Sequence, residues 1–303
     1  MSSPDLVFDR HAVRLHRARA ARRFAGFDFL FRAGAERLAD RLADMTGRFP
    51  LALELGAHGD ILHAAVGSTG GIETLVSADL VAGFAARAGG PCVVADEEFL
   101  PFGDGRFDLV LSNLSLHWVN DLPGALIQIR NALRPDGLLL ASMLGGPTLG
   151  ELRACLIEAE AAVTDGASPR VSPFVDMRDA GALLQRAGFA LPVVDSDVLT
   201  VTYSDALALM RDLRGMGETN AVAARPRHCT RRAILLRAAD LYAQRFATGD
   251  GRVYATFDIV TLTGWAPSAT QPQPLKPGSA KARLADALDV RERSAGEKAG
   301  PRG

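Results

Sequence analysis

Acidic side chains stand at the ends of three successive apolar stretches that have the length of buried strands. They are Glu54, then Asp79 about twenty-five residues later, then the group Asp96-Glu97-Glu98. In open α/β sheets, ligands bind at the carboxyl ends of the strands, so these carboxylates are predicted to meet at one edge of a sheet. Each acid taken alone could equally be a helix cap. The series favours a cationic ligand that carries hydroxyl groups, with Asp79 placed to hold a ribose diol.

The turn after the first acidic strand end has the sequence Gly56-Ala57-His58-Gly59-Asp60. Dinucleotide-binding turns need the spacing G-x-G-x-x-G, so this turn disfavours NAD. His58 carries a side chain where a glycine would let the backbone approach a ligand. Asp60 adds a charge there, although an acid also suits the start of the following helix. The turn therefore predicts either a ligand site of altered shape or a fold that has lost its ligand.

Two aromatic rings, His117 and Trp118, follow directly after the fourth predicted strand, at the edge of the same site. A histidine there is a candidate general base, because its pKa lies near the working pH. The alternative is that both rings pack under the loop that leads to Asn120. His63 and His228 are isolated, with no carboxylate or cysteine at ligand spacing, so no metal site is predicted.

Composition narrows the class of protein. The 303 residues include 34 basic and 35 acidic side chains, and the net charge of −1 offers no overall attraction for nucleic acid. The three cysteines lie more than sixty residues apart, which argues against a zinc knuckle, a redox pair or a secreted disulfide framework. No apolar run approaches the ~20 residues that cross a bilayer. We therefore expect a soluble or at most peripheral protein of a reducing compartment.

Short apolar strands alternate with helical stretches from Pro50 onward, which is typical of a mostly parallel sheet with helices on both faces. Two later stretches, Val193–Tyr203 and Arg252–Trp265, are predicted to form an antiparallel pair at one edge of that sheet. The five earlier strands are predicted at Leu51–Leu55, Thr74–Ala78, Cys92–Ala95, Leu109–Ser112 and Leu138–Met143.

Three regions are predicted along the chain. Residues 1–49 form an N-terminal basic helical segment, whose arginines are either solvated or a docking surface for an acidic partner or membrane headgroups. Residues 50–265 form the α/β domain, with a helical insertion at about 204–250. Residues 266–303 are rich in proline and are expected to be mostly disordered. The apolar face of a helix that leads into the core is predicted at Phe31, Ala35, Leu38 and Leu42.

Five short blocks of sequence follow one another along the predicted domain. They are Glu54-Leu55-Gly56, Ala78-Asp79, Asp96 to Phe102, Phe107 to Val110 and Leu133 to Gly137. In this order they resemble the class I S-adenosylmethionine-dependent methyltransferases. The resemblance implies a Rossmann-like α/β fold with a seven-stranded sheet and helices on both faces. It also implies S-adenosylmethionine as the cofactor.

Further blocks outside the cofactor motifs narrow the resemblance. They are Phe8-Asp9-Arg10, Leu114 to Pro123, Gly145-Gly146, Ser172-Pro173-Phe174, Gly215 to Glu218 and Ile259 to Trp265. They are similar to the mitochondrial respiratory complex I assembly factor five family and its bacterial relatives. A related family, the malonyl carrier-protein methyltransferases of biotin synthesis, shares Ser112-Asn113-Leu114 and Thr148 to Leu152.

The resemblance also assigns individual residues to the site. Glu54 and Gly56 are expected to face the methionine part of the cofactor, and Asp79 the ribose. Asp96 and Glu97 are expected to face the adenine edge. Asn113 and Leu114 are expected to form the floor beneath the sulfonium. His117 is the candidate catalytic residue. The substrate residues, at the mouth of the pocket and in the insertion, are Trp118, Gly145, Gly146, Thr148, Glu151, Arg211 and Glu218.

The function that this resemblance implies is a role in complex I maturation, where the mitochondrial family is described as hydroxylating an arginine of the quinone-site subunit. The implied partner is that subunit. The expected location is a bacterial cytoplasm, with peripheral association at the inner membrane, because no presequence stands ahead of Phe8. Two alternatives remain open: methylation of a carrier-protein-bound or small-molecule substrate, as in biotin synthesis, and a non-catalytic assembly scaffold with a degenerate cofactor site.

Overall fold

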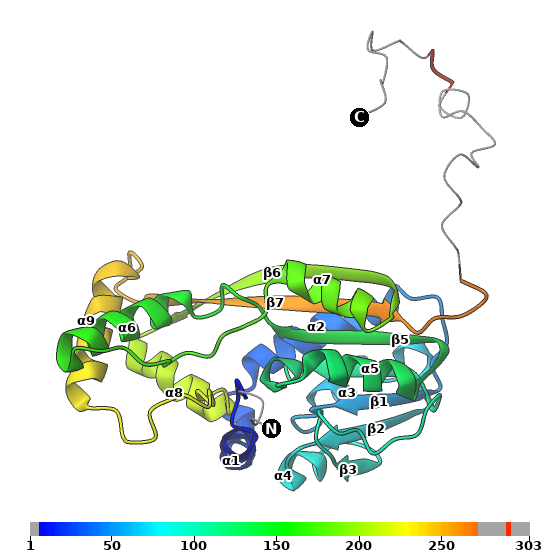
Figure 1. Ribbon diagram of the computed structural model, residues 1–303, viewed down its shortest axis with the longest axis horizontal. Coiled ribbons are helices and arrows are strands. Elements are labelled where there is room, and N and C mark those ends of the chain that lie inside the picture. The colour runs from blue at the N-terminus through cyan, green and yellow to red at the C-terminus, as the bar shows by residue number, and fades with distance from the viewer. Residues whose placement is uncertain (1–5, 272–288, 292–303) are drawn as a thin grey trace, which may run out of the picture. The chain divides into compact units, whose positions relative to one another are not determined.

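The protein is described by a computed structural model that covers residues 6–271 and 289–291 (Figure 1). The described helices and strands lie in one compact unit, which ends at Ser268. The predicted disordered tail, residues 266–303, falls mostly outside the described residues. No helix in the described ranges is both long and apolar enough to cross a membrane.

Seven strands form one mixed sheet in the order β3-β2-β1-β4-β5-β7-β6 (Figure 1). The first five strands in this order run parallel, whereas β7 is antiparallel to both β5 and β6. The predicted mostly parallel sheet with an antiparallel pair at one edge is confirmed. The strands are β1 Leu51–Leu55, β2 Thr74–Asp79, β3 Cys92–Val94, β4 Phe107–Asn113, β5 Leu133–Leu144, β6 Ala190–Tyr203 and β7 Val253–Trp265.

Strand β5 begins at Leu133, earlier than the predicted Leu138. Its early part pairs Leu133 with Phe107, after which the register shifts before the regular ladder begins. The intervening Pro135 and Asp136 are exposed, and Asp136 has a φ of 63°. Such residues are typical of a turn, so the sequence pattern concealed the first part of the strand.

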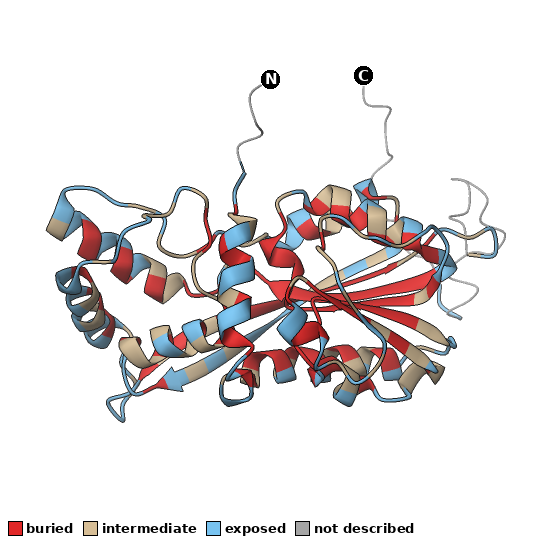
Figure 2. Cartoon of the chain, turned by 90° about the horizontal axis from the view of Figure 1, so that it is seen from below, coloured by how far each residue is buried: buried red, intermediate tan, exposed pale blue. Residues whose placement is uncertain are grey.

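Helices cover both faces of the sheet. Side chains alternate along each strand, so Leu109 and Leu111 of β4 join the core beneath α2, whereas Val110 joins the core beneath α5 and α7. Figure 2 shows the inner strands buried along most of their length, whereas the edge strands β3 and β6 are mainly intermediate or exposed. The helices are α1 Arg10–Ala20, α2 Phe29–Ala43, α3 Ile61–Val66, α4 Ala82–Ala85, α5 Leu122–Ala132, α6 Gly150–Thr164, α7 Met177–Arg186, α8 Ala206–Met216 and α9 Arg232–Arg245, with 3-10 turns η1 Phe24–Gly26, η2 Thr69–Gly71 and η3 Leu116–Trp118.

The long strands β6 and β7 extend past the parallel strands to a second group of helices, α6, α8 and α9 (Figure 1). Helix α9 lies against α6, where Ile234, Ala238 and Tyr242 are buried in the same core as Phe257 of β7. Helices α8 and α9 fall within the residues predicted as a helical insertion. The buried residues of these helices share one core with Val253, Ala255 and Phe257, so the helices cover the extended part of β7.

The N-terminal segment differs in one respect from the sequence prediction. The predicted apolar face of α2 is confirmed, because Phe31, Ala35, Leu38 and Leu42 are fully buried. Helix α1 was expected to expose its arginines, yet Arg17 is only 1% exposed. Seven residues separate Arg10 from Arg17, close to two helical turns, so both side chains project from the face that meets the sheet.

A glycine in α2 allows that helix to approach the end of β4, and its replacement is expected to destabilise the fold. A Cβ at Gly34 would lie 2.4 Å from Asn113 Oδ1. Alanine improves helix propensity by about 1 kcal/mol, but displacing the buried amide should cost about 1–3 kcal/mol. Gly34→Ala should therefore lower the free energy of unfolding in urea.

Gly181→Ala is the matched control, because Gly181 also lies inside a helix and its added Cβ would meet only Val194 Cγ2 at 3.9 Å. This variant should be as stable as the wild type or more stable. Equal stability of both alanine variants would contradict the close approach of α2 to β4.

Candidate functional site

The predicted carboxylates do meet at one edge of the sheet. β1, β2 and β3 are neighbours, so Glu54, Asp79 and Glu97 come together at or just beyond their carboxyl ends. All three are buried, with exposed fractions of 0%, 1% and 2%. Buried carboxylates require partners, because an unpaired charge is strongly disfavoured away from water.

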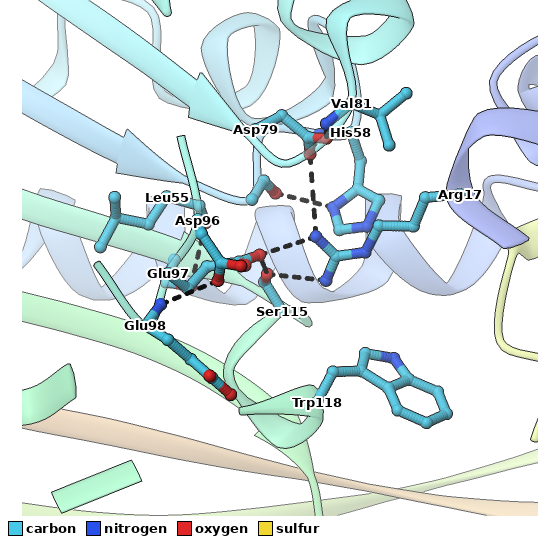
Figure 3. Close-up of polar contacts among 12 residues, drawn as sticks. Arg17, Leu55, His58, Asp79, Val81, Asp96, Glu97, Glu98, Ser115 and Trp118 are labelled. Atoms are coloured by element: carbon cyan, nitrogen blue, oxygen red, sulfur yellow. Dashed lines mark hydrogen bonds and ion pairs between the residues drawn. The ribbon is translucent and has the colours of Figure 1, made fainter. Parts of the chain in front are cut away.

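The partner of two of these acids is Arg17 of α1, which lies between Asp79 and Glu97 (Figure 3). Its Nη1 is 2.7 Å from Glu97 Oε1 and 4.0 Å from Asp79 Oδ2. Its Nη2 donates to Ser115 Oγ at 2.9 Å, and this hydroxyl in turn donates to Glu97. The guanidinium is thus held from two sides by side chains of the sheet edge.

Arg10 holds the outer part of the same edge. Its Nη2 pairs with both Asp96 and Glu97, and its Nε lies 3.8 Å from Glu98 Oε1. We call these groups, Arg10, Arg17, Glu54, Asp79, Asp96 and Glu97, the strand-end cluster.

The start of α1 is fixed by local hydrogen bonds. Asp9 caps the helix, since its Oδ1 accepts from the backbone N–H of Ala12 at 3.1 Å. The preceding Phe8 donates its N–H to Asn120 Oδ1 at 2.8 Å and accepts from Asn120 Nδ2 at 3.2 Å. The Phe8 ring also packs edge-on against Trp118, with ring centroids 5.4 Å apart. These contacts set the position from which Arg10 and Arg17 reach the acids.

Burial and pairing separate the proton affinities of the three acids. Burial raises the pKa of Glu54 to about 8, although Ser77 Oγ donates to it at 2.6 Å. Burial also raises the pKa of Asp79 to about 6, against the opposing charge of Arg17. Burial alone would raise the pKa of Glu97 as well, but Arg17 and Arg10 hold it well below its usual range. Near neutral pH, Glu54 is therefore mainly protonated and Glu97 is ionised.

His58 fills the turn after β1. Its φ is 49°, and its ring lies 4.4 Å from that of Phe31 and 5.2 Å from that of Phe84 between ring centroids. Nδ1 is 2.7 Å from the carbonyl oxygen of Gly56, whereas Nε2 is buried without a partner. Burial lowers the pKa of His58, so the ring is neutral. Asp60 precedes α3, but its side chain makes no capping hydrogen bond.

The two residues predicted as the floor of the cofactor site lie at the end of β4. Both polar atoms of the Asn113 side chain are hydrogen-bonded within the protein, because Nδ2 donates to the carbonyl oxygen of Phe31 at 2.8 Å and Oδ1 accepts from Ser142 Oγ at 2.9 Å. Leu114 is buried, with a φ of 48°. Their assignment to the cofactor remains a prediction.

A second site lies on the other side of α1. A cavity of about 380 Å³ opens between η3 and the helices α6, α8 and α9. The carboxylate of Glu218 lines it and lies 3.0 Å from His117 Nε2, while Trp118 Nε1 donates to the same carboxylate at 3.0 Å. His117 is buried and its Nδ1 has no partner. Much of the remaining lining is apolar, as in Leu30, Leu144, Leu149, Leu152, Met210 and Phe257.

The other predicted substrate residues are not among those that line this cavity. Gly145 contacts β7 so closely that a Cβ would lie 2.1 Å from Asp258 Oδ2, and Gly146 lines a separate groove. Thr148 Oγ1 accepts from the Asp258 N–H at 3.0 Å, and Glu151 accepts from the Thr256 hydroxyl. Arg211 is exposed on α8. The structure thus brings together His117, Trp118 and Glu218 and separates them from this group, whose role at the substrate mouth stays a prediction.

Sequence reasoning missed the inward arginines and Ser115. The sequence analysis treated Arg10 and Arg17 like the other arginines of the N-terminal basic helical segment, all of which were expected to be exposed. Their spacing of seven residues was the available signal, because it places both on one helix face opposite the acids. Ser115 gave no such signal. Among the described residues, no group of three or more His, Cys, Asp or Glu could hold a metal ion.

Comparison with known proteins agrees with this architecture. Residues 53–141 match the family described as "Methyltransferase domain". The mitochondrial arginine-hydroxylase NDUFAF5 of Danio rerio is 42% identical over 92% of this chain and 89% of its own length, and that of Homo sapiens is 42% identical over 90% and 81%. A malonyl-[acyl-carrier protein] O-methyltransferase of Methylovorus sp. is 34% identical over 89% and 93%.

These relatives identify the class of protein. The chain belongs to the S-adenosylmethionine-dependent methyltransferase superfamily, and within it to the family that contains the NDUFAF5 arginine hydroxylases. A methyltransferase-like structure from Bacillus halodurans shares the fold, with a TM-score of 0.54 at 17% identity, over 78% of this chain and the whole of that one. The predicted fold class and its enzyme superfamily are confirmed.

The cofactor of the superfamily does not fit the strand-end cluster as it stands. The charges suit S-adenosylmethionine, because carboxylates lie at three neighbouring strand ends. The available space does not suit this cofactor. A ligand-sized gap would leave the side chains around it exposed, but each of these is at most 2% exposed: Arg17, Glu54, Asp79 and Glu97. Gly56 approaches Ser115 instead of a ligand, since a Cβ there would lie 2.1 Å from Ser115 Oγ.

The raised pKa of Glu54 predicts a pH-dependent stability. The folded protein keeps a proton on Glu54 up to about pH 8, whereas the pKa of an unperturbed glutamate is 4.5. The free energy of unfolding should therefore fall as pH rises through this interval, by at most about 1.4 kcal/mol per pH unit. Unfolding in urea at pH 7 and at pH 9 measures the loss.

Glu54→Gln should lose less stability than the wild type between these two pH values, because the amide has no proton to release. Glu36→Gln, at an exposed position of α2, is the control and should keep the loss seen in the wild type. An unchanged pH dependence in Glu54→Gln would contradict the assignment.

Proposed function

We propose that this protein modifies an arginine side chain of a protein partner, the quinone-site subunit of respiratory complex I. The observation that carries the proposal is the 42% identity to the arginine-hydroxylase NDUFAF5 over about nine-tenths of both chains. The matched length includes the helical insertion as well as the parallel sheet. Hydroxylation, as in the name of those relatives, is the reaction that we propose.

The cavity beside η3 has the chemistry to receive an arginine side chain. Apolar residues suit the aliphatic stem, and Glu218 offers a carboxylate to the guanidinium. The arginines Arg170 and Arg225 also line the cavity, but each is paired with an acid, Glu160 or Asp9. Arg214 stands at the exposed end of α8. Glu218 therefore provides the negative charge of the lining.

Neighbouring side chains hold Glu218 in place. Its side chain is 5% exposed and is fixed by Trp118 Nε1 and His117 Nε2. Trp118 also lines the cavity and can cover an arginine stem or the face of a guanidinium. His117 then acts through Glu218, orienting the carboxylate instead of contacting the substrate directly.

Glu218→Gln tests this proposal in a strain that lacks the chromosomal gene. Loss of a charge-assisted hydrogen bond costs about 1.5–3 kcal/mol, so modification of the quinone-site subunit should fall roughly ten- to a hundredfold. Mass spectrometry of that subunit measures the modified fraction of its arginines. Glu36→Gln should restore the wild-type fraction. Full modification with Glu218→Gln, or none with the wild-type gene, would count against the proposal.

The second candidate is methylation of a malonyl group on a carrier protein. It is favoured by the 34% identity to such a methyltransferase and by Arg214 in the cavity lining, which could bind a carboxylate. Biotin auxotrophy of the deletion strain, with normal levels of complex I, would support this candidate.

The third candidate is a scaffold without catalysis, which is favoured by the closed strand-end cluster. Under that reading, Asp79→Ala in a still-folded protein leaves complex I assembly intact. Loss of assembled complex I with that variant would exclude the scaffold.

We propose in addition that the protein works in the bacterial cytoplasm, at the surface of the inner membrane. The outer face of α1 and the residues that follow it expose Arg14, Arg19, Arg22 and Arg23. Each arginine near an anionic membrane surface contributes about 1 kcal/mol of attraction. The protein should float with vesicles that contain anionic lipid, but not with purely zwitterionic vesicles.

Replacing these four arginines by glutamine should abolish flotation. Replacing Arg231, Arg232 and Arg237 of the α9 region, which are also exposed, should not. Equal flotation of all three proteins would contradict the role of α1.

A further inference from the structure

Helix α1 places a cation in the part of the fold that the superfamily uses for a cationic cofactor. Arg17 contributes one positive charge, two N–H groups directed at Glu97 and Ser115, and a third contact with Asp79 at 4.0 Å. S-adenosylmethionine would bring a sulfonium, an ammonium and the hydroxyl groups of its ribose. Arginine and cofactor therefore offer the same carboxylates the same kind of partner.

The two cannot be bound together. Arg17 is 1% exposed and the carboxylates around it are at most 2% exposed, so no free space adjoins the guanidinium. The aromatic rings around His58 close the inner side, and Ser115 closes the side that faces Gly56. Entry of a cofactor requires that Arg17 leave.

We propose that α1 is a built-in competitor of the cofactor: Arg17 and S-adenosylmethionine exclude one another at Asp79 and Glu97, and the cofactor binds only after α1 withdraws. This proposal concerns access to the strand-end cluster. It does not depend on which substrate the protein modifies.

The attachment of α1 is of a kind that can be released. The helix has 11 residues, and helices shorter than about 12–15 residues are marginal without tertiary contacts. It is held by ion pairs and by a small apolar cluster of its own, to which Phe8, Ala12 and Val13 contribute. This cluster is separate from the two larger cores of the sheet. Only Ala20, at the end of α1, belongs to one of these larger cores, so withdrawal of the helix removes one small side chain from them.

The same helix also forms a wall of the cavity beside η3. His16 lines that cavity, and its Nδ1 lies 3.1 Å from the carbonyl oxygen of Thr219, next to Glu218. Arg17, the following residue, faces the carboxylates. Withdrawal of α1 opens both sites at once, so a molecule that displaces the helix from one site makes the other accessible.

Calorimetric titration of the full chain with S-adenosylmethionine tests the competition. Arg17→Gln removes the competing charge and should bind the cofactor at least tenfold more tightly than the wild type, because the wild type must first open. Arg14→Gln, from the exposed side of the same helix, should match the wild type. Equal affinity of the wild type and Arg17→Gln would overturn the proposal, as would the absence of binding to both folded proteins.

Hydrogen exchange on the wild type provides an independent test if Arg17→Gln does not fold. Adding S-adenosylmethionine should reduce the protection of amides in residues 10–20, while residues 29–43 of α2 keep theirs. Unchanged or increased protection of residues 10–20 would overturn the proposal. Neither outcome bears on the arginine modification, which the mass spectrometry of the partner subunit decides separately.

Discussion

The ion pair between Arg17 and Glu97 is the interaction on which the arrangement of both sites depends. Two charges at most 2% exposed are costly to remove from water, and the cost is recovered only by close pairing and by hydrogen bonds to the remaining polar atoms. Ser115 and Asp79 complete that pairing. Removal of one partner would leave an uncompensated buried charge, which typically costs about 3–5 kcal/mol. The position of α1 is therefore set by this ion pair together with the contacts of Phe8 with Asn120 and Trp118.

This constraint explains why the strand-end cluster and the cavity are related. α1 borders both sites, with Arg17 directed at the sheet edge and His16 at the cavity. Glu218 lines the cavity, and its charge also favours the ionised form of Arg17. A change at either site is transmitted through one short helix. The superfamily fold thus supplies the carboxylates, while the segment that precedes the sheet controls their availability.

Much of the fold follows from sequence pattern, because strand periodicity and the acids at strand ends are local features. The succession of β1, β2, β3 and β4 along the chain, with helices or loops between them, was predictable from alternating apolar and helical stretches. The antiparallel partner strands β6 and β7 were predictable from their Val, Thr and Ile content. The early part of β5 was not, because Pro135 and Asp136 have the composition of a turn. The apolar face of α2 was predictable because a helix repeats its face every three to four residues.

The sequence by itself determined which residues carry charge, where the strands end and which family the chain resembles. Tertiary structure alone decided which charges are paired. Arg17 and Glu97 are 80 residues apart in the chain, and His117 and Glu218 are 101 apart, so no local pattern connects them. The inward direction of Arg17 depends on the distance between α1 and the sheet edge. Whether His58 and Gly56 face a ligand or other side chains depends on packing, because burial removes water and forces every polar group to find a partner within the protein.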